Sequence, residues 1–173
     1  AALPVALEVL VEIEDSWQFL AADVRNRLER LVRNLPTGSL DALERLLEFT
    51  PLREASEHRV KNLTREDIRS TSFFTLPPSI ADRCIDLYLL SGTFAEANEW
   101  ASEVGRHAID FSADQQRRLL TEAATRTDVR SSFQLPTVVA RLRQTNKLPH
   151  AEFVALARAL GIDLAEPPPP AEP

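Results

Sequence analysis

The sequence predicts an all-α protein of about nine helices in stacked antiparallel hairpins, either a HEAT-like α-solenoid or a helical bundle. Three observations support this: recurring Leu-Pro pairs, capping signals that agree with the apolar spacing, and no alternating strand pattern. The pairs are Leu3-Pro4, Leu35-Pro36, Leu76-Pro77 and Leu135-Pro136. Proline fits the first turn of a helix because the N–H that it lacks would have no partner there. A second helix start follows each pair, and one hairpin is too small to bury its own apolar stripe, so successive hairpins should stack.

Apolar residues at helical spacing predict four helices in the first 60 residues. The first covers residues 5–13. The second covers about 16–34, with one stripe formed by Trp17, Leu20, Val24, Leu28, Leu31 and Leu35. A third is built on the leucines between 40 and 47, and a fourth runs from Pro51 to about Val60.

Three later helix starts carry capping boxes, in which two side chains three residues apart bond each other's free backbone N–H. The pairs are Thr64 with Asp67, Thr93 with Glu96, and Ser112 with Gln115. The helix at 77–90 is apolar nearly all round and is expected to be central, whereas the one from Thr93 has a stripe of small residues that lets a neighbour approach closely. Gly92 and Gly161 stand where helices must stop, and positive φ at glycine suits a C-terminal cap.

The helices are expected to form one helical-hairpin domain over residues 1–162. The polar and charged segment 61–76 is a candidate sub-boundary, although we favour a longer hairpin connection within one continuous stack. Residues 163–173 contain Pro167-Pro168-Pro169-Pro170 and should form a Pro-rich flexible tail.

The composition of the chain argues against several classes of protein. The net charge of −6 argues against a dedicated duplex-binding protein, and no stretch approaches the ~20 apolar residues that cross a bilayer. A single cysteine gives no internal disulfide, which favours a reducing, cytoplasmic location. The chain contains no methionine and begins Ala1-Ala2, which favours a piece of a larger protein over a natural start that has lost its methionine.

The repeated units resemble a known architecture. The first three Leu-Pro pairs stand 32 and 41 residues apart. Units of this length, each two antiparallel helices with a proline near the first, resemble degenerate HEAT or armadillo-type α-solenoid repeats. The Arg-rich composition and the predicted helical hairpins over 3–162 are also similar to those of helical arms of large bacterial signalling or defence NTPases. The resemblance implies a part that senses or scaffolds while another domain does the chemistry, and it carries over no functional residue.

The residues needed for common reaction and metal sites do not occur at the required spacing. The four glycines are scattered singly, whereas phosphate-binding loops need several together. His58, His107 and His150 are isolated and have no cysteine partners for zinc. Cys84 lies on an apolar helix, which indicates a buried side chain rather than a nucleophile. We therefore predict no catalytic residue, no cofactor and no metal, and interpret the chain as a non-enzyme.

The basic stretch 117–147 is the strongest electrostatic feature. Its charged residues are Arg117, Arg118, Arg126, Arg130, Arg141, Arg143 and Lys147 against Glu122 and Asp128. We select Arg117, Arg126, Arg130 and Arg141 as partner-binding candidates, with Phe73 as an apolar anchor. The alternative for these arginines is a solvated helical face.

The sequence thus predicts a non-catalytic interaction or regulatory module that recognises a protein partner. One alternative is an accessory helical domain of a multidomain bacterial enzyme of NTPase or nuclease type. Another is a weak nucleic-acid binder that uses 117–147. That stretch contains one aromatic residue, Phe133, whereas single-strand binders use several for base stacking.

Overall fold

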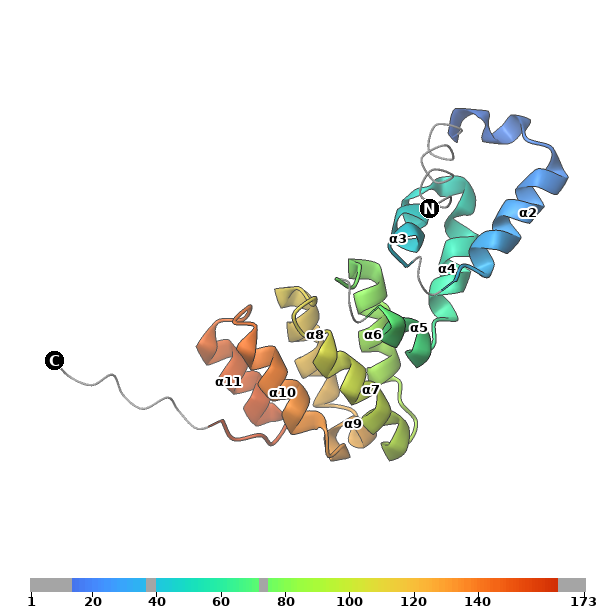
Figure 1. The fold of residues 1–173 in the computed structure, drawn as a ribbon. Coiled ribbons are helices and arrows are strands. Elements are labelled where there is room, and N and C mark those ends of the chain that lie inside the picture. The colour runs from blue at the N-terminus through green and yellow to red at the C-terminus, as the bar shows by residue number, and fades with distance from the viewer. Residues whose placement is uncertain (1–13, 37–39, 72–74, 165–173) are drawn as a thin grey trace. The chain divides into compact units, whose positions relative to one another are not determined.

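The computed structural model describes residues 14–36, 40–71 and 75–164. Over these residues the protein is all-helical, with α-helices α2 to α11, two 3₁₀ helices and no strand, which confirms the predicted all-α class. The helix predicted at 5–13 and almost all of the predicted tail lie outside the described residues. The chain divides into two compact units, residues 1–84 and 85–173, with the division inside α6 (Figure 1). The boundaries predicted from the sequence, 1–162 with a sub-boundary at 61–76, stay predictions.

The first unit contains short helices around a leucine-rich core. Its elements are η1 (Glu14–Phe19), α2 (Ala22–Arg33), α3 (Leu40–Glu48), η3 (Thr50–Leu52), α4 (Arg53–Lys61), α5 (Arg65–Ser70) and the first part of α6 (Pro78–Leu89). Helix α4 packs against both α2 and α3. Leu43, Leu52 and Ile68 are fully buried in this core, so apolar burial at helical spacing joins the elements.

The prediction of one continuous helix over 16–34 is wrong. The chain forms a 3₁₀ helix that ends at Phe19, and α2 begins only after Ala21, whose ψ of 143° is extended and interrupts the helical hydrogen bonds. The buried face of α2 also differs from the predicted stripe. Leu31 is 65% exposed although the stripe includes it, whereas Val32 beside it is buried.

The first turn of α6 receives a cap from a distant helix. Glu44 on α3 accepts a hydrogen bond from the backbone N–H of Ser79 at 3.3 Å and another from the Ser79 hydroxyl at 2.8 Å. Carboxylates stabilise helix N-termini because the first N–H groups have no partner within the helix. Glu44 therefore connects α3 to α6 within the first unit.

The second unit contains the last part of α6 and five further helices. They are α7 (Phe94–Arg106), α8 (Ala113–Ala123), α9 (Thr127–Ser131), α10 (Leu135–Gln144) and α11 (His150–Ala159). Helix α7 packs chiefly against α10, α8 packs against α11, and the short α9 contacts α7 (Figure 1). Phe111, Leu119 and Leu142 are fully buried in the unit's core.

The capping predictions are confirmed with one exception. Two boxes are complete: Thr64 with Asp67, and Ser112 with Gln115. At the third, the Thr93 side chain accepts from the Glu96 N–H, but the Glu96 carboxylate accepts from the N–H of Gly92 at 3.0 Å. Gly92 has no positive φ, so its predicted role as a C-terminal cap is wrong. It donates its N–H to the following helix instead.

Gly161 confirms the predicted cap at the end of α11. Its φ is +79°, its N–H donates to the carbonyl of Arg158 at 2.9 Å, and the N–H of Ile162 donates to the carbonyl of Ala157 at 3.0 Å. This pair of bonds is the Schellman arrangement, which places the residue after the helix in the left-handed region. A side chain there would be strained.

Gly161 and Gly105, both in the second unit, have different backbone conformations, so replacing each by alanine should change the free energy of unfolding in opposite directions. Gly161→Ala should lower the free energy of unfolding by about 1 kcal/mol, because Cβ disfavours positive φ. Gly105→Ala should raise it by about 0.5–1 kcal/mol, since Gly105 lies inside α7 and its added Cβ would meet only Arg141 Cγ, at 4.0 Å. Urea unfolding followed by Trp100 fluorescence, with Trp17 replaced by Phe, measures both; shifts of the same sign would contradict this account.

A buried ion pair stabilises the turn between α4 and α5. Arg59 Nη2 lies 2.8 Å from Asp67 Oδ1, and Arg59 Nε donates to the carbonyl of Leu35 at 3.0 Å. Burial acts to raise the pKa of Asp67, but hydrogen bonds from Arg59 and from the N–H and hydroxyl of Thr64 outweigh it, so the pKa lies below its usual value.

The lowered pKa of Asp67 makes stability depend on pH. A carboxyl with a lower pKa in the folded than in the unfolded protein stabilises the fold above the unfolded value, about 3.9, and this contribution is lost as pH falls through the folded pKa. Asp67→Asn should therefore cost about 2 kcal/mol at pH 7, and the difference from wild type should shrink below about pH 4. Trp17 fluorescence, with Trp100 replaced by Phe, reports urea unfolding from pH 7 to 3. Asp41→Asn, at an exposed position on α3, is the control, and its unfolding midpoints should follow those of wild type over the whole pH range.

Candidate functional site

Arg117, the first predicted partner-binding residue, is bound within the second unit. Its Nε lies 2.5 Å from Glu152 Oε1 on α11, and its Nη1 lies 2.5 Å from Asp114 Oδ1. The hydrogen bond with Glu152 is the main cause that raises the pKa of Arg117. Arg117 therefore joins α8 to α11, and these internal ion pairs explain the position of its side chain without a binding partner.

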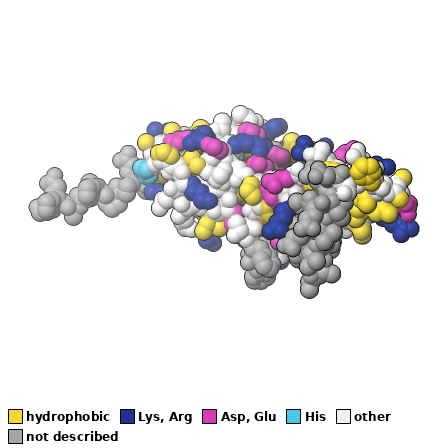
Figure 2. Space-filling view, turned by 90° about the horizontal axis from the view of Figure 1, so that it is seen from above, with side chains coloured by type: hydrophobic (Ala, Val, Ile, Leu, Met, Phe, Trp, Pro, Cys, Tyr) yellow, Lys and Arg dark blue, Asp and Glu magenta, His cyan; other side chains and the backbone are white. Residues whose placement is uncertain are grey.

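Two further cations of the 117–147 stretch also bind inside this unit. Arg118 forms an ion pair with Asp86 near the end of α6. Lys147 Nζ donates to the backbone carbonyl of Phe111 at 2.7 Å. On the face seen in Figure 2, basic and acidic side chains lie among one another and no broad area of one charge is visible. The stretch is thus less basic at the surface than its composition indicates.

The other predicted arginines are exposed and lie at different places. Arg126 precedes α9, and its side chain makes no hydrogen bond or ion pair with the residues that the structure describes. Arg130 is 3.4 Å from the carbonyl of Ala124 and borders a shallow pocket of about 320 Å³. Arg141 lies in a groove between α7 and α10. Phe73, the predicted apolar anchor, lies outside the described residues.

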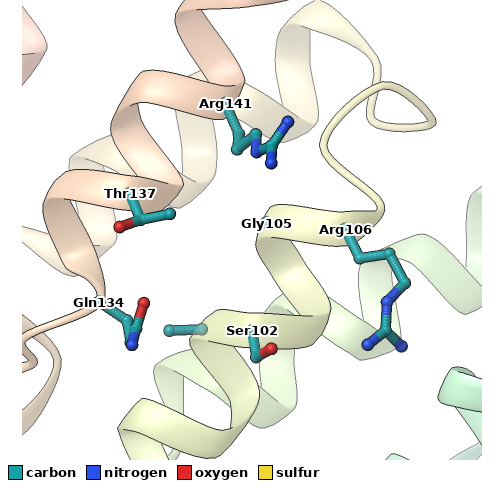
Figure 3. A pocket seen from close by; sticks show the side chains of 7 residues that line it. Ser102, Gly105, Arg106, Gln134, Thr137 and Arg141 are labelled. Atoms are coloured by element: carbon teal, nitrogen blue, oxygen red, sulfur yellow. The ribbon is translucent and has the colours of Figure 1, made fainter.

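The α7–α10 groove has a volume of about 400 Å³. Its lining residues are Ala101, Ser102, Gly105, Arg106, Gln134, Thr137 and Arg141. Figure 3 shows Arg141 extending from α10 towards α7, while Arg106 points away from the groove. Arg106 Nη1 is also bound to the buried Glu103, with Nη1 and Oε2 2.5 Å apart. Of the two arginines that line the groove, Arg141 is therefore the one without an ion partner among the residues that the structure describes.

The two helices that form the groove run parallel. At their N-terminal ends the rings of Phe94 and Phe133 meet edge to face, with centroids 4.8 Å apart. At the opposite end, Gly105 on α7 faces Arg141 Cγ on α10. Spacings of seven and four residues return to the same face of a helix, so Phe94, Ala101 and Gly105 form one stripe on α7. The phenylalanine pair therefore lies at the N-terminal ends of the two helices, just before the lining residue Gln134, and Arg141 lies towards the opposite end of the groove.

Polar contacts fix the helices at the end near the phenylalanine pair. The hydroxyl of Ser132, in the turn before α10, donates to Asn98 Oδ1 on α7 at 2.8 Å. The same Ser132 oxygen accepts from the backbone N–H of Gln134 at 3.3 Å. Ser132 is buried, so these bonds form away from water and hold Phe133 in place.

A second polar cluster fixes the opposite end. The amide nitrogen of Gln116, which is fully buried, lies 2.9 Å from Thr145 Oγ1 just after α10. It also lies 3.3 Å from the carbonyls of Ala108 and Phe111, in the segment that follows α7. Gln116 thus connects the segments that follow the C-terminal ends of α7 and α10.

The phenylalanine pair is exposed although both residues are large and apolar. Phe133 is 81% exposed and Phe94 is 37% exposed. Phe73, and neither Phe94 nor Phe133, was selected from the sequence as the apolar anchor. The repeated Ser-Phe before Leu-Pro, at 72–77 and 132–136, gave a signal for Phe133 but did not separate it from Phe73.

The residues most often used in reactions lie apart from the groove. Cys84 is buried, as predicted. His107 is also buried, and its Nδ1 lies 3.0 Å from Asp110 Oδ2. Within residues 14–36, 40–71 and 75–164 there is no group of three or more His, Cys, Asp or Glu that could hold a metal ion. None of the described helices combines the length and apolar character needed to span a bilayer.

Comparisons with protein-family models, with curated proteins and with solved structures found no match for this chain. The resemblance to HEAT or armadillo-type repeats therefore stays a prediction.

The Gln116 cluster should contribute measurably to the stability of the second unit. Gln116→Leu leaves the carbonyls of Ala108 and Phe111 with fewer donors, so we expect a loss of about 2 kcal/mol in the free energy of unfolding. Urea unfolding followed by Trp100 fluorescence measures it, and Gln144→Leu at an exposed position of α10 is the matched control. Equal midpoints for the two variants would show that the cluster contributes no net stability.

Proposed function

We propose that this chain is a non-catalytic helical interaction module that recognises a protein partner through the α7–α10 groove. The observation that carries the proposal is the exposed Phe94–Phe133 pair at the N-terminal ends of the two helices that form that groove. Large aromatic side chains in contact with water mark interaction sites when they border a recess, because burial against a partner recovers the free energy of their exposure. Aromatic and arginine side chains also dominate the binding energy of protein interfaces.

The same surface would serve if the chain were an accessory helical domain of a multidomain enzyme, since the neighbouring domain would then be the partner.

Binding of nucleic acid is less well supported. Phosphate backbones are bound by several cations at once, and Arg117, Arg118 and Lys147 are already bound to other groups of the unit. A cytoplasmic location remains part of the proposal.

A capture experiment with matched variants tests the proposal. Tagged wild type, Phe133→Asp and Ile109→Asp are incubated with cell extract, and the proteins retained by each are quantified by mass spectrometry. Ile109 is the control because it is 71% exposed and lies outside the groove. We expect proteins that wild type and Ile109→Asp retain equally and that Phe133→Asp retains at least tenfold less, as the loss of an interface hot spot predicts.

The retained protein must then bind the purified chain directly in calorimetry, with the same dependence on Phe133. If Phe133→Asp has wild-type circular dichroism and retains the same proteins as wild type, the groove is not the recognition surface and the proposal is wrong.

A further inference from the structure

Resting on the proposed function, we infer that the groove binds a short acidic peptide segment in an extended conformation. A carboxylate of that segment pairs with Arg141. An apolar side chain three or four residues away packs on the Phe94–Phe133 pair.

The charge of the occupant follows from Arg141. Arg106, the other cation lining the groove, is bound to Glu103, while Arg141 has no such partner among the residues that the structure describes. Figure 3 shows its guanidinium extending towards α7 rather than along the outside of α10. A guanidinium presents two parallel N–H groups that match both oxygens of a carboxylate, so an acidic side chain is the complementary group.

The conformation of the occupant follows from the length and the lining of the groove. Gln134 and Arg141 are seven residues apart on α10, which corresponds to about 10 Å at 1.5 Å per residue. An extended chain covers this distance in about three residues. A helix pairs its own backbone N–H and C=O groups and would leave the neutral polar side chains that line the groove without a backbone partner. The extended form is therefore the better fit.

The walls of the groove offer groups that an extended backbone can use. Ser102, Gln134 and Thr137 line it with neutral side chains that make no hydrogen bond to other described side chains or carbonyls. An extended peptide presents unpaired N–H and C=O groups to such side chains. Ala101 and Gly105 carry the smallest side chains, so the peptide backbone can approach α7 closely at these positions.

Peptide selection with a charge-reversed variant tests the inference. A library of random 12-residue peptides displayed on phage is selected against wild type, Arg141→Glu and Arg126→Glu. Arg126 is the matched control because it is exposed, has no ion partner in the described part of the chain, and lies outside the groove. Wild type and Arg126→Glu should enrich peptides with Asp or Glu three or four residues from an aromatic or aliphatic residue. Arg141→Glu should lose these and enrich Lys or Arg at the acidic position.

The best synthetic peptide then gives the affinities. Arg141→Glu should weaken its binding at least tenfold and Phe133→Ala at least fivefold, while Arg126→Glu should change it less than twofold. Replacing the acidic residue of the peptide by Lys should restore part of the binding to Arg141→Glu. Such restoration requires direct contact, because a variant that is merely misfolded cannot regain affinity from a change in the peptide.

Several outcomes would overturn the inference. They are a selection that enriches no peptide from wild type, enriched peptides without acidic residues, an unchanged profile for Arg141→Glu, and a bound peptide that is helical by circular dichroism. Tight binding of a generic single-stranded oligonucleotide that Arg141→Glu abolishes would assign the groove to phosphate instead. If cellular partners depend on Phe133 but not on Arg141, the inference is wrong while the proposed function stands.

Discussion

The close parallel packing of α7 on α10 is the constraint on which the candidate site depends. Buried polar contacts from Ser132 and Gln116 fix the two ends of the helix pair. Buried hydrogen bonds of this kind are costly to break because the groups that they satisfy have no water to replace the partner. The groove is therefore a consequence of how the core of the second unit is built.

Charged side chains that form ion pairs within the fold are not available to bind a partner. Arg117 is bound to Glu152 on α11, and Arg59 to the buried Asp67 in the first unit. The strength of a basic stretch as a recognition surface depends on how many cations remain after these internal pairs have formed. In the 117–147 stretch, Arg141 is an exposed cation that has no ion pair in the described part of the chain and that lines the α7–α10 groove.

The features predicted correctly from the sequence are those set by neighbours three or four residues away. The capping boxes at Thr64 and Ser112 and the glycine cap at Gly161 depend on local backbone geometry, so the residue types alone indicate them.

The break at Ala21 was missed because helical spacing continues through it. The pairing of Arg117 with Glu152 was missed because the two residues are 35 positions apart and meet only after α8 packs on α11. Arg141 was selected correctly as exposed, yet its groove partners on α7 follow from tertiary packing.

The position of Phe133 connects these constraints to recognition. An exposed ring on a mobile segment would lose entropy when a partner orders it. Phe133 instead follows the buried Ser132, and its ring packs edge to face on Phe94, so its orientation is set before binding. Side chains ordered in advance make more of their contact energy available as affinity. An aromatic pair fixed in this way at the N-terminal ends of α7 and α10, together with an arginine that has no ion partner in the described chain, presents two demands that one occupant must meet together. This is the condition for a specific site rather than a generally sticky surface.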